Sequence, residues 1–431
     1  MVNESAQERS GLSVNEWKKA VAFDSIDWGW IVMSVGMAIG SGIVFLPVQI
    51  GVTGLLIFLL SAIIGYPAMY LFQRLYINTL ASSPENTVYA DTISNYLGKN
   101  WGFLMGVAYF VMLMDTLMGY ATTVNNDSGS FLYTFGLTST NLSSSAVFTL
   151  ALMTILIFIA SLGEKVLFKL QTVMALIILA ALLFMGFSFV PLWNLGNVAS
   201  LPDAVTTVKQ VIIMLPFTLC SILFIQSLSP MVMSYRHHNE NKEVAMYKSM
   251  RAMNISFILL FIIVFFFAVS FNLGTSKEMA VAAKEANISA LAIAAGGMDA
   301  ATVKIFSLLL ALFAILTSFF SNFIGFCESI KGIVLNVLRR VMNVSKIAPK
   351  TLDIAIAVFG IFFCWIIVAF NIPVLVLLSL LGPLIGIVGC IIPAILVYKV
   401  PALQQYKGMG LWFIVFAGVL LIISPFLNIL E

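Results

Sequence analysis

Long apolar segments separated by short polar ones run through almost the entire chain. A helix rises about 1.5 Å per residue, so roughly 20 apolar residues cross a hydrocarbon core about 30 Å thick. The apolar segments lack the period-two alternation that the strands of a transmembrane β-barrel require. Hydropathy therefore predicts an all-α membrane protein with about eleven transmembrane helices. The expected spans are residues 27–51, 54–76, 102–125, 144–162, 167–190, 209–234, 252–273, 301–326, 353–371, 373–398 and 410–429.

Composition supports lipid as the solvent of this chain. Of its 431 residues, 61% are hydrophobic and 10% are charged, whereas soluble domains carry about 25% charged residues. Residues 1–26 form a polar tail without the apolar core of a signal peptide. The four cysteines all fall within apolar spans, so we expect no disulfide framework and no zinc site. We expect membrane lipid around the protein and no nucleic-acid partner.

The basic residues predict the orientation in the membrane. With a cytoplasmic N-terminus, all but four of the 22 Lys and Arg residues lie on the inner side. The positive-inside rule then places the N-terminus in the cytoplasm of a bacterial cell, and an odd number of inner-membrane spans places the C-terminus in the periplasm. The four basic residues expected outside are Lys209, Lys277, Lys284 and Lys304.

The first predicted span contains residues that disfavour a continuous helix. Gly36, Gly40 and Gly42 lie within seven residues of one another, and Pro47 follows. Glycine costs about 1 kcal/mol relative to alanine inside a helix, and proline removes a backbone donor. We therefore expect a break in this span, although close packing of neighbouring helices is an alternative use of the glycines.

The sixth predicted span is interrupted as well. It contains Pro216 and a polar run that ends at Pro230, which we expect to break the helix. Spans 1 and 6 are five helices apart, and interrupted spans in matching positions of two halves are typical of inverted-repeat transporters. The expected organisation is a cytoplasmic tail, a first repeat, a second repeat and an added helix, at residues 1–26, 27–190, 191–398 and 399–431.

These breaks predict a binding site. In inverted-repeat transporters, N–H groups at a helix break bind an anionic group and unwound carbonyls bind a cation, which suits an amino-acid zwitterion. We expect Gly40, Ser41 and Gly42 to present N–H groups to the substrate carboxylate. The serines of the sixth span have an alternative use, since serine often bonds to the carbonyls of its own helix. The expected partners of the substrate ammonium or side chain are Gln226, Ser227 and Ser229.

Two sets of residues are candidates for ion coupling. Asp115 is the one acidic residue deep within a predicted span, and an intramembrane carboxylate costs about 2.5–3.5 kcal/mol on insertion scales. It is a candidate carrier of a coupling proton, with a neutral acid bonded to another helix or a watery vestibule as alternatives. The eighth span offers hydroxyl groups for a sodium ion, or for bonds between helices. These hydroxyl groups belong to Thr317, Ser318 and Ser321.

Two further segments carry predictions about the outer side. Asn125, Asn126 and Asp127 are interpreted as the outer end of the third span, with an outer gate as the alternative. Residues 277–295 are alanine-rich and amphipathic, which predicts a surface helix between spans 7 and 8.

Seven short segments, in order along nearly the whole chain, carry a family resemblance. They are Gly36-Met-Ala-Ile-Gly-Ser-Gly-Ile-Val-Phe-Leu-Pro47, Gly65-Tyr-Pro-Ala-Met-Tyr70, Gly163-Glu-Lys165, Ser229-Pro230, Ala283-Lys-Glu-Ala-Asn-Ile-Ser289, Gly382-Pro-Leu-Ile-Gly386 and Lys399-Val-Pro-Ala402. Through them the chain resembles the hydroxy- and aromatic-amino-acid permease family, most closely its serine transporters. The branch that resembles D- and L-serine or cysteine carriers is nearer than the ordinary L-serine permeases.

The resemblance implies a LeuT-like fold of two inverted five-helix repeats and import of serine, threonine, tryptophan or tyrosine, typically driven by protons. Two positions depart from the family pattern. Ser227 and Leu228 stand where serine permeases usually carry Asn-His, and Thr317 stands where several members carry lysine. Both departures fall near the expected site, so the substrate and the coupling ion stay open.

We therefore expect a secondary active transporter that imports a small hydroxy amino acid, L- or D-serine first, by proton-coupled alternating access. Cysteine, threonine or aromatic substrates, sodium coupling, exchange, and a sensor without net flux stay as alternatives. The sequence has no phosphate loop, metal-ligand cluster or nucleophile–base pair, so we expect neither an enzyme nor a cofactor.

Overall fold

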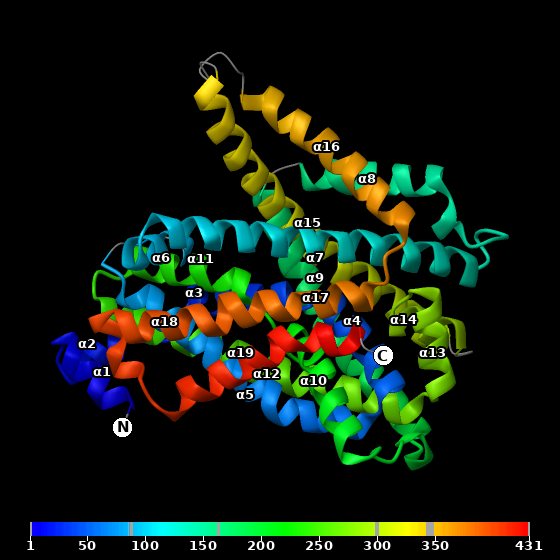
Figure 1. Cartoon of the computed structure of the whole chain (residues 1–431), viewed down its shortest axis with the longest axis horizontal. Helices are drawn as coiled ribbons and strands as arrows, with labels where there is room; N and C mark the ends of the chain where they lie inside the picture. The colour runs from blue at the N-terminus through cyan, green and yellow to red at the C-terminus, as the bar shows by residue number, and fades with distance from the viewer. Residues whose placement is uncertain are drawn as a thin grey trace.

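The protein is helical throughout the part of the chain that its computed structural model describes, residues 2–84, 86, 89–161, 164–297, 301–341 and 349–429. In Figure 1, α7, α17 and α18 run along the long axis, whereas α15 and α16 run obliquely away from it; α1 and α2 lie at one end and α13 and α14 at the other. The helices that correspond to the predicted spans are α3 (Ser25–Ala38), α4 (Ser41–Thr53), α5 (Leu55–Ser82), α7 (Lys99–Thr134), α8 (Ala146–Ala160), α9 (Glu164–Phe189), α10 (Ala204–Cys220), α11 (Ile225–His238), α12 (Lys242–Gly274), α15 (Ala301–Val341), α16 (Pro349–Phe370), α17 (Val374–Ile385), α18 (Ile392–Lys399) and α19 (Met409–Ile429).

Length and hydropathy identify this chain as a multi-span membrane protein. Eight helical stretches in the described residues are long and apolar enough to cross a membrane, or nine if α3 and α4 form one bent span. Helix α8 is apolar but shorter, at 15 residues. Each predicted span coincides with a helix or a helix pair. The number of eleven spans stays a prediction.

The first span is broken where the glycines predict it. Helices α3 and α4 meet at 45°, and Ile39 and Gly40 between them have extended backbones. A Cβ on Gly42 would lie 2.6 Å from the carbonyl oxygen of Cys220, and one on Gly40 would lie 2.5 Å from the Ser318 hydroxyl oxygen. The break therefore brings the backbone of α4 against α10 at a distance that only glycine permits.

The second break does not lie at the prolines, and the expectation that Pro230 ends the helix is wrong. Pro216 lies inside α10 and Pro230 lies inside α11, while the interruption is the short segment 221–224 between them. There the Ser221 hydroxyl donates to the carbonyl of Thr218 at 2.7 Å, so a side chain competes with the backbone for that acceptor. Proline inside a membrane helix is tolerated because neighbouring groups can satisfy the freed carbonyl.

The polar tail folds against the bundle. Helices α1 (Val2–Ser10) and α2 (Val14–Ala20) lie beside the start of α12, and Trp17 is buried with Val21 and Val244. The predicted surface helix at 277–295 forms two helices instead, α13 (Lys277–Ala286) and α14 (Ala290–Gly297). Asn287 divides them because it adopts the left-handed conformation, with φ of 52°, which ends a helix.

Candidate functional site

A small cavity lies where the two helix breaks meet. Its volume is about 30 Å³, room for roughly two water molecules by the criterion of 10–15 Å³ each. The two broken spans line it together with α7 and α17. The lining residues are Met37, Ala38, Gly42, Asp115, Thr116, Gly119, Tyr120, Cys220, Leu223, Gln226, Leu377, Leu378 and Leu381.

Two unpaired oxygens give this cavity its chemistry. The Oδ2 atom of Asp115 on α7 and the Oε1 atom of Gln226 on α11 are both buried, and neither has a hydrogen-bond partner among the described residues. An unpaired buried acceptor costs about 1–3 kcal/mol, more for a charged one. Both oxygens would therefore be stabilised by a bound cation or ammonium group, and the Asp115 oxygen also by a proton.

The start of α4 offers donors to the same cavity. Gly40 is the N-cap residue of this 13-residue helix and has no side chain to cap the first N–H groups. Uncapped N–H groups at a helix start, together with the helix dipole, attract an anion. Gly42, in the first turn, lines the cavity. Ser41 supplies the first residue of the helix, and its side chain lies outside the described part.

The serines of the sixth span point to neighbouring helices and do not line the cavity. The Ser227 hydroxyl lies 2.8 Å from the Ser34 hydroxyl of α3 and donates to the carbonyl of Phe224 at 2.9 Å. The Ser229 hydroxyl lies 2.9 Å from the Tyr76 hydroxyl of α5. Of the three polar residues predicted on this span, only Gln226 lines the cavity.

One hydroxyl of α15 reaches the first break. Ser318 donates to the carbonyl of Ile39 at 2.7 Å, as expected if the eighth span faces the first. Thr317 donates to carbonyls of its own helix, at 2.9 Å to Phe313 and 3.0 Å to Ala314. Ser321 donates to the carbonyl of Thr317 at 3.0 Å. Of the three hydroxyl residues predicted on the eighth span, Ser318 therefore bonds to the break of the first span, while Thr317 and Ser321 bond within α15.

Three asparagines join the helices on the side of α13 and α14. Asn126 donates to the side-chain oxygen of Asn371 at 3.0 Å, and Asn287 donates to the same oxygen at 3.0 Å. Next to them, Asp127 accepts from the backbone N–H of Ser289 at 2.9 Å. The expectation that Asn125, Asn126 and Asp127 end the third span is wrong, because α7 continues to Thr134. All three side chains are buried against neighbouring segments.

A charged cluster joins α3, α11 and α12 at the N-terminal end of α3, away from the first break. Asp27 is fully buried and accepts from Tyr235 at 2.8 Å and from Arg251 at 2.7 Å. Asp24 accepts from Lys248 at 2.6 Å and caps α3 reciprocally with Asp27. Asp115 is therefore not alone among the acids in being buried, because Asp27, at the first residue of a predicted span, and Asp127, just beyond another, are buried as well.

Sequence reasoning named Asn126 as part of a possible outer gate but missed its partners, and it missed the charged cluster altogether. The charged cluster had a local signal in the sequence. The spacing Asp24-x-x-Asp27 is a capping-box pattern, and Lys248 and Arg251 share a face of α12. Asn287 and Asn371 are far apart in sequence and sit in turns. The leucines of α17 that line the cavity cannot be told from lipid-facing leucines in the sequence. No local sequence pattern predicts the contacts of these leucines or of Asn287 and Asn371.

The close approach at the first break allows a stability prediction. Gly42→Ala places a Cβ 2.6 Å from a backbone oxygen, which cannot move away as a flexible side chain can. Overpacking of this kind costs about 1–3 kcal/mol. Thermal unfolding of the purified protein in detergent should occur at a clearly lower temperature. The matched control is Gly106→Ala in α7, where a Cβ meets nothing within 4 Å; equal melting of the two variants would contradict the packing.

Comparison with known proteins adds a family. Residues 24–428 match the tryptophan/tyrosine permease family. One relative is a protein of Escherichia coli O157:H7 named "Serine transporter". It is 55% identical over 422 residues, which cover 97% of this chain and 95% of the relative.

Solved structures share the fold at low sequence identity. The manganese transporter of Eremococcus coleocola superposes with a TM-score of 0.56 at 14% identity, covering 97% of this chain and 87% of that one. MhsT, solved in complex with L-phenylalanine, gives a TM-score of 0.55 at 15% identity, covering 93% of this chain and 97% of that one. These are transporters of the LeuT-like fold with unrelated cargoes, so the likeness defines the architecture and leaves the substrate open.

Proposed function

This chain belongs to the tryptophan/tyrosine permease family, and from that membership we propose that it imports serine by ion-coupled alternating access. The relative that is 55% identical over almost the full length is named a serine transporter. The cavity of about 30 Å³ is closed to any amino acid as it stands, so it would have to widen for serine to bind. Threonine, cysteine and aromatic amino acids are the alternative substrates.

The single observation that carries the proposal is the pair of unpaired oxygens beside an uncapped helix start. In our proposal, the N–H groups at Gly40, Ser41 and Gly42 bind the serine carboxylate. The Gln226 side-chain oxygen accepts from the ammonium or hydroxyl group of serine, and its burial without a partner supports this role. Ser227 and Ser229 then act indirectly, by holding the inner half of the sixth span against α3 and α5.

Asp115 is our proposed carrier of the coupling proton. Its buried, unpaired oxygen lies in the same cavity as the proposed substrate groups. In our proposal, the Asp115 carboxyl takes up a proton when the site is open to the periplasm. It releases the proton when the site is open to the cytoplasm. A carboxyl within a span is a functional candidate by default because its burial is costly.

The two joints on either side of the cavity are the proposed gates. Asn126, Asn287 and Asn371 hold the outer side, and Asp27 with its basic partners holds the inner side. In alternating access the two gates open in turn. We propose that residues 27–190 and 191–398 are the two inverted repeats, with 1–26 cytoplasmic and 399–431 an added helix that ends in the periplasm.

Sodium coupling is the second candidate, and one contact favours it. The Ser318 hydroxyl oxygen lies 2.7 Å from the carbonyl oxygen of Ile39 at the break of the first span. A sodium ion prefers such hard oxygen ligands, and a small rearrangement would let both oxygens face an ion. Thr317 and Ser321 donate to carbonyls of their own helix, and their hydroxyl oxygens keep lone pairs that a cation could use.

Uptake into proteoliposomes tests the proposal. Labelled L-serine should accumulate above its outside concentration under an imposed inward proton gradient, and not under a sodium gradient alone. Unlabelled L-serine should suppress this uptake more strongly than L-tryptophan. Accumulation that follows only the sodium gradient would overturn proton coupling, and accumulation of another amino acid instead of serine would overturn the substrate.

A further inference from the structure

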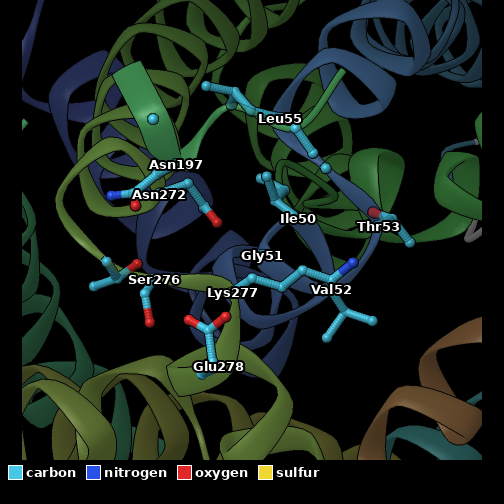
Figure 2. A pocket seen from close by; sticks show the side chains of 14 residues that line it. Ile50, Gly51, Val52, Thr53, Leu55, Asn197, Asn272, Ser276, Lys277 and Glu278 are labelled. Carbon is cyan, nitrogen blue, oxygen red and sulfur yellow. The ribbon is translucent and has the colours of Figure 1, made fainter. Parts of the chain in front are cut away.

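A second and larger pocket lies at the far end of α4. Its volume is about 190 Å³. Helix α4 has 13 residues, so this pocket and the central cavity are separated by about 18 Å of the same helix. Figure 2 shows the pocket between the end of α4, the start of α5, the end of α12 and the start of α13. The lining residues are Ile50, Gly51, Val52, Thr53, Gly54, Leu55, Gly196, Asn197, Ala199, Asn272, Thr275, Ser276, Lys277 and Glu278.

A buried asparagine presents an unpaired oxygen to this pocket. Asn272 is only 6% exposed, and its side-chain nitrogen donates to the carbonyl of Ala268 at 2.9 Å. A carbonyl can only accept, so this bond fixes which amide atom is the nitrogen. The remaining amide oxygen accepts no hydrogen bond from the described residues, and Asn272 forms part of the pocket wall in Figure 2.

Opposite charges lie next to each other at the mouth. Lys277 and Glu278 are the first two residues of α13, and both are exposed at the pocket. A hydrogen bond from the Ser276 hydroxyl lowers the pKa of Glu278, so its carboxylate is charged at neutral pH. Figure 2 shows the Lys277 side chain extending toward Val52 and the Glu278 carboxylate turned the other way, toward Ser276.

Helix ends complete the set of polar groups. Gly54, with φ of 115°, turns the chain from α4 into α5, and its N–H donates to the carbonyl of Ile50 at 2.7 Å. The carbonyls of Gly51 and Val52 at the end of α4 then have no backbone donor among the described residues. Helix α13 starts here as well, but the Ser276 hydroxyl already caps it by accepting from the Met279 N–H at 3.5 Å, and Glu278 lies in its first turn. The pocket therefore offers acceptors at the end of α4, at Asn272 and at Glu278, and one charged donor at Lys277.

We propose that this pocket is a second binding site for a small zwitterionic amino acid, occupied independently of the central cavity. The ammonium group would bind the Asn272 oxygen, the Glu278 carboxylate and the end of α4. The carboxylate would bind the Lys277 ammonium group. A simple cation would match the acceptors alone and would be repelled by Lys277. That the amino acid is serine rests on the proposed function.

Equilibrium binding of labelled L-serine to the purified protein in nanodiscs tests the second site. At saturation the wild-type chain should bind about two serines, and Asn272→Leu combined with Glu278→Gln should bind about one, a loss of about half. Glu285→Gln is the matched control, since Glu285 lies on α13 but does not line the pocket. A wild-type chain that binds a single serine, which the double variant retains, would overturn the proposal.

A thiol-protection experiment separates this proposal from the function of the central site. In a Gln226→Leu background, Ser276→Cys should be modified by a charged thiol reagent, and L-serine should slow that reaction at least about tenfold. Absence of protection by serine, alanine or glycine would overturn the proposal whether or not serine is transported. Protection by alanine or glycine but not serine would overturn only the proposed substrate.

Lipid is the other source of a zwitterionic group near this pocket, because phosphatidylethanolamine carries both an ammonium and a phosphate. The nanodiscs are therefore prepared once with phosphatidylglycerol alone and once with added phosphatidylethanolamine. Serine protection of Ser276→Cys in both lipids supports the amino-acid site. Protection by phosphatidylethanolamine without serine, and none by serine in phosphatidylglycerol, would assign the pocket to a lipid headgroup and overturn the proposal.

Discussion

Asp115→Asn is expected to abolish uphill accumulation of serine under a proton gradient while exchange of external for internal serine continues. Asparagine has nearly the shape of the carboxyl group but cannot take up or release a proton. The loss of concentrative uptake should be complete within the error of the assay, which means a decrease of more than about tenfold. The measurement is paired uptake and counterflow of labelled serine in the same proteoliposomes.

Asp203→Asn is the matched control for Asp115→Asn. Asp203 is the N-cap residue of α10, is exposed, and accepts from the N–H groups of Val205 and Thr206. Asparagine caps helices about as well as aspartate, so this variant should transport normally. If Asp115→Asn also accumulates serine as the wild type does, Asp115 is not the proton carrier. The Ser318 contact with the Ile39 carbonyl would then become the leading coupling site.

The spans and the first break were predictable because they depend on local sequence. Hydropathy over about 20 residues does not require knowing which helices touch, and each predicted span coincides with a helix or helix pair. Gly42 was predictable for the same reason, since a dense glycine run is costly unless a close approach needs it. The position of the second break was not predictable. It lies at the segment where the Ser221 hydroxyl donates to the Thr218 carbonyl, whereas Pro216 and Pro230 lie inside α10 and α11.

The candidate site could be predicted only in part, because polarity does not tell which way a side chain points. Asp115 and Gln226 line the cavity, and their roles there stay predictions. Ser227 and Ser229 lie on the same short helix as Gln226 but are turned toward α3 and α5. A helix turns about 100° per residue, so a one-residue change in where α11 starts would change which of them faces the cavity.

The cluster around Asp27, our proposed inner gate, is held by buried rather than exposed charges. Asp27 has no exposed surface, and Arg251 and Lys248 are 21% and 5% exposed, so their attraction is little screened by water. Arg9 and Glu243 form a pair nearby that is far more exposed, at 53% and 26%. Exposed pairs contribute about 0–1 kcal/mol, whereas breaking a buried pair costs about 3–5 kcal/mol. The gate therefore depends mainly on Asp27.

Asp27→Asn should open the inner side of the protein. The amide keeps the shape of the carboxylate but removes the charge that Arg251 and Lys248 share. Loss of a hydrogen bond to a charged group is worth about 1.5–3 kcal/mol, which shifts the balance between closed and open inner gates by about 10- to 100-fold. Cys220 reports this shift because it lines the cavity between the gates and is 8% exposed.

The rate of Cys220 modification by a maleimide should therefore rise at least about tenfold in inside-out vesicles carrying Asp27→Asn, and not in right-side-out vesicles. Cys327, the one cysteine of the four that is partly exposed, is first replaced by alanine so that it does not contribute to the reaction. Glu243→Gln breaks only the exposed pair with Arg9 and should leave the rate unchanged. Equal rates for Asp27→Asn and its parent on the inner side would mean that the buried cluster stabilises the fold without acting as a gate. A rise only in right-side-out vesicles would instead reverse the orientation proposed for the two ends of α3.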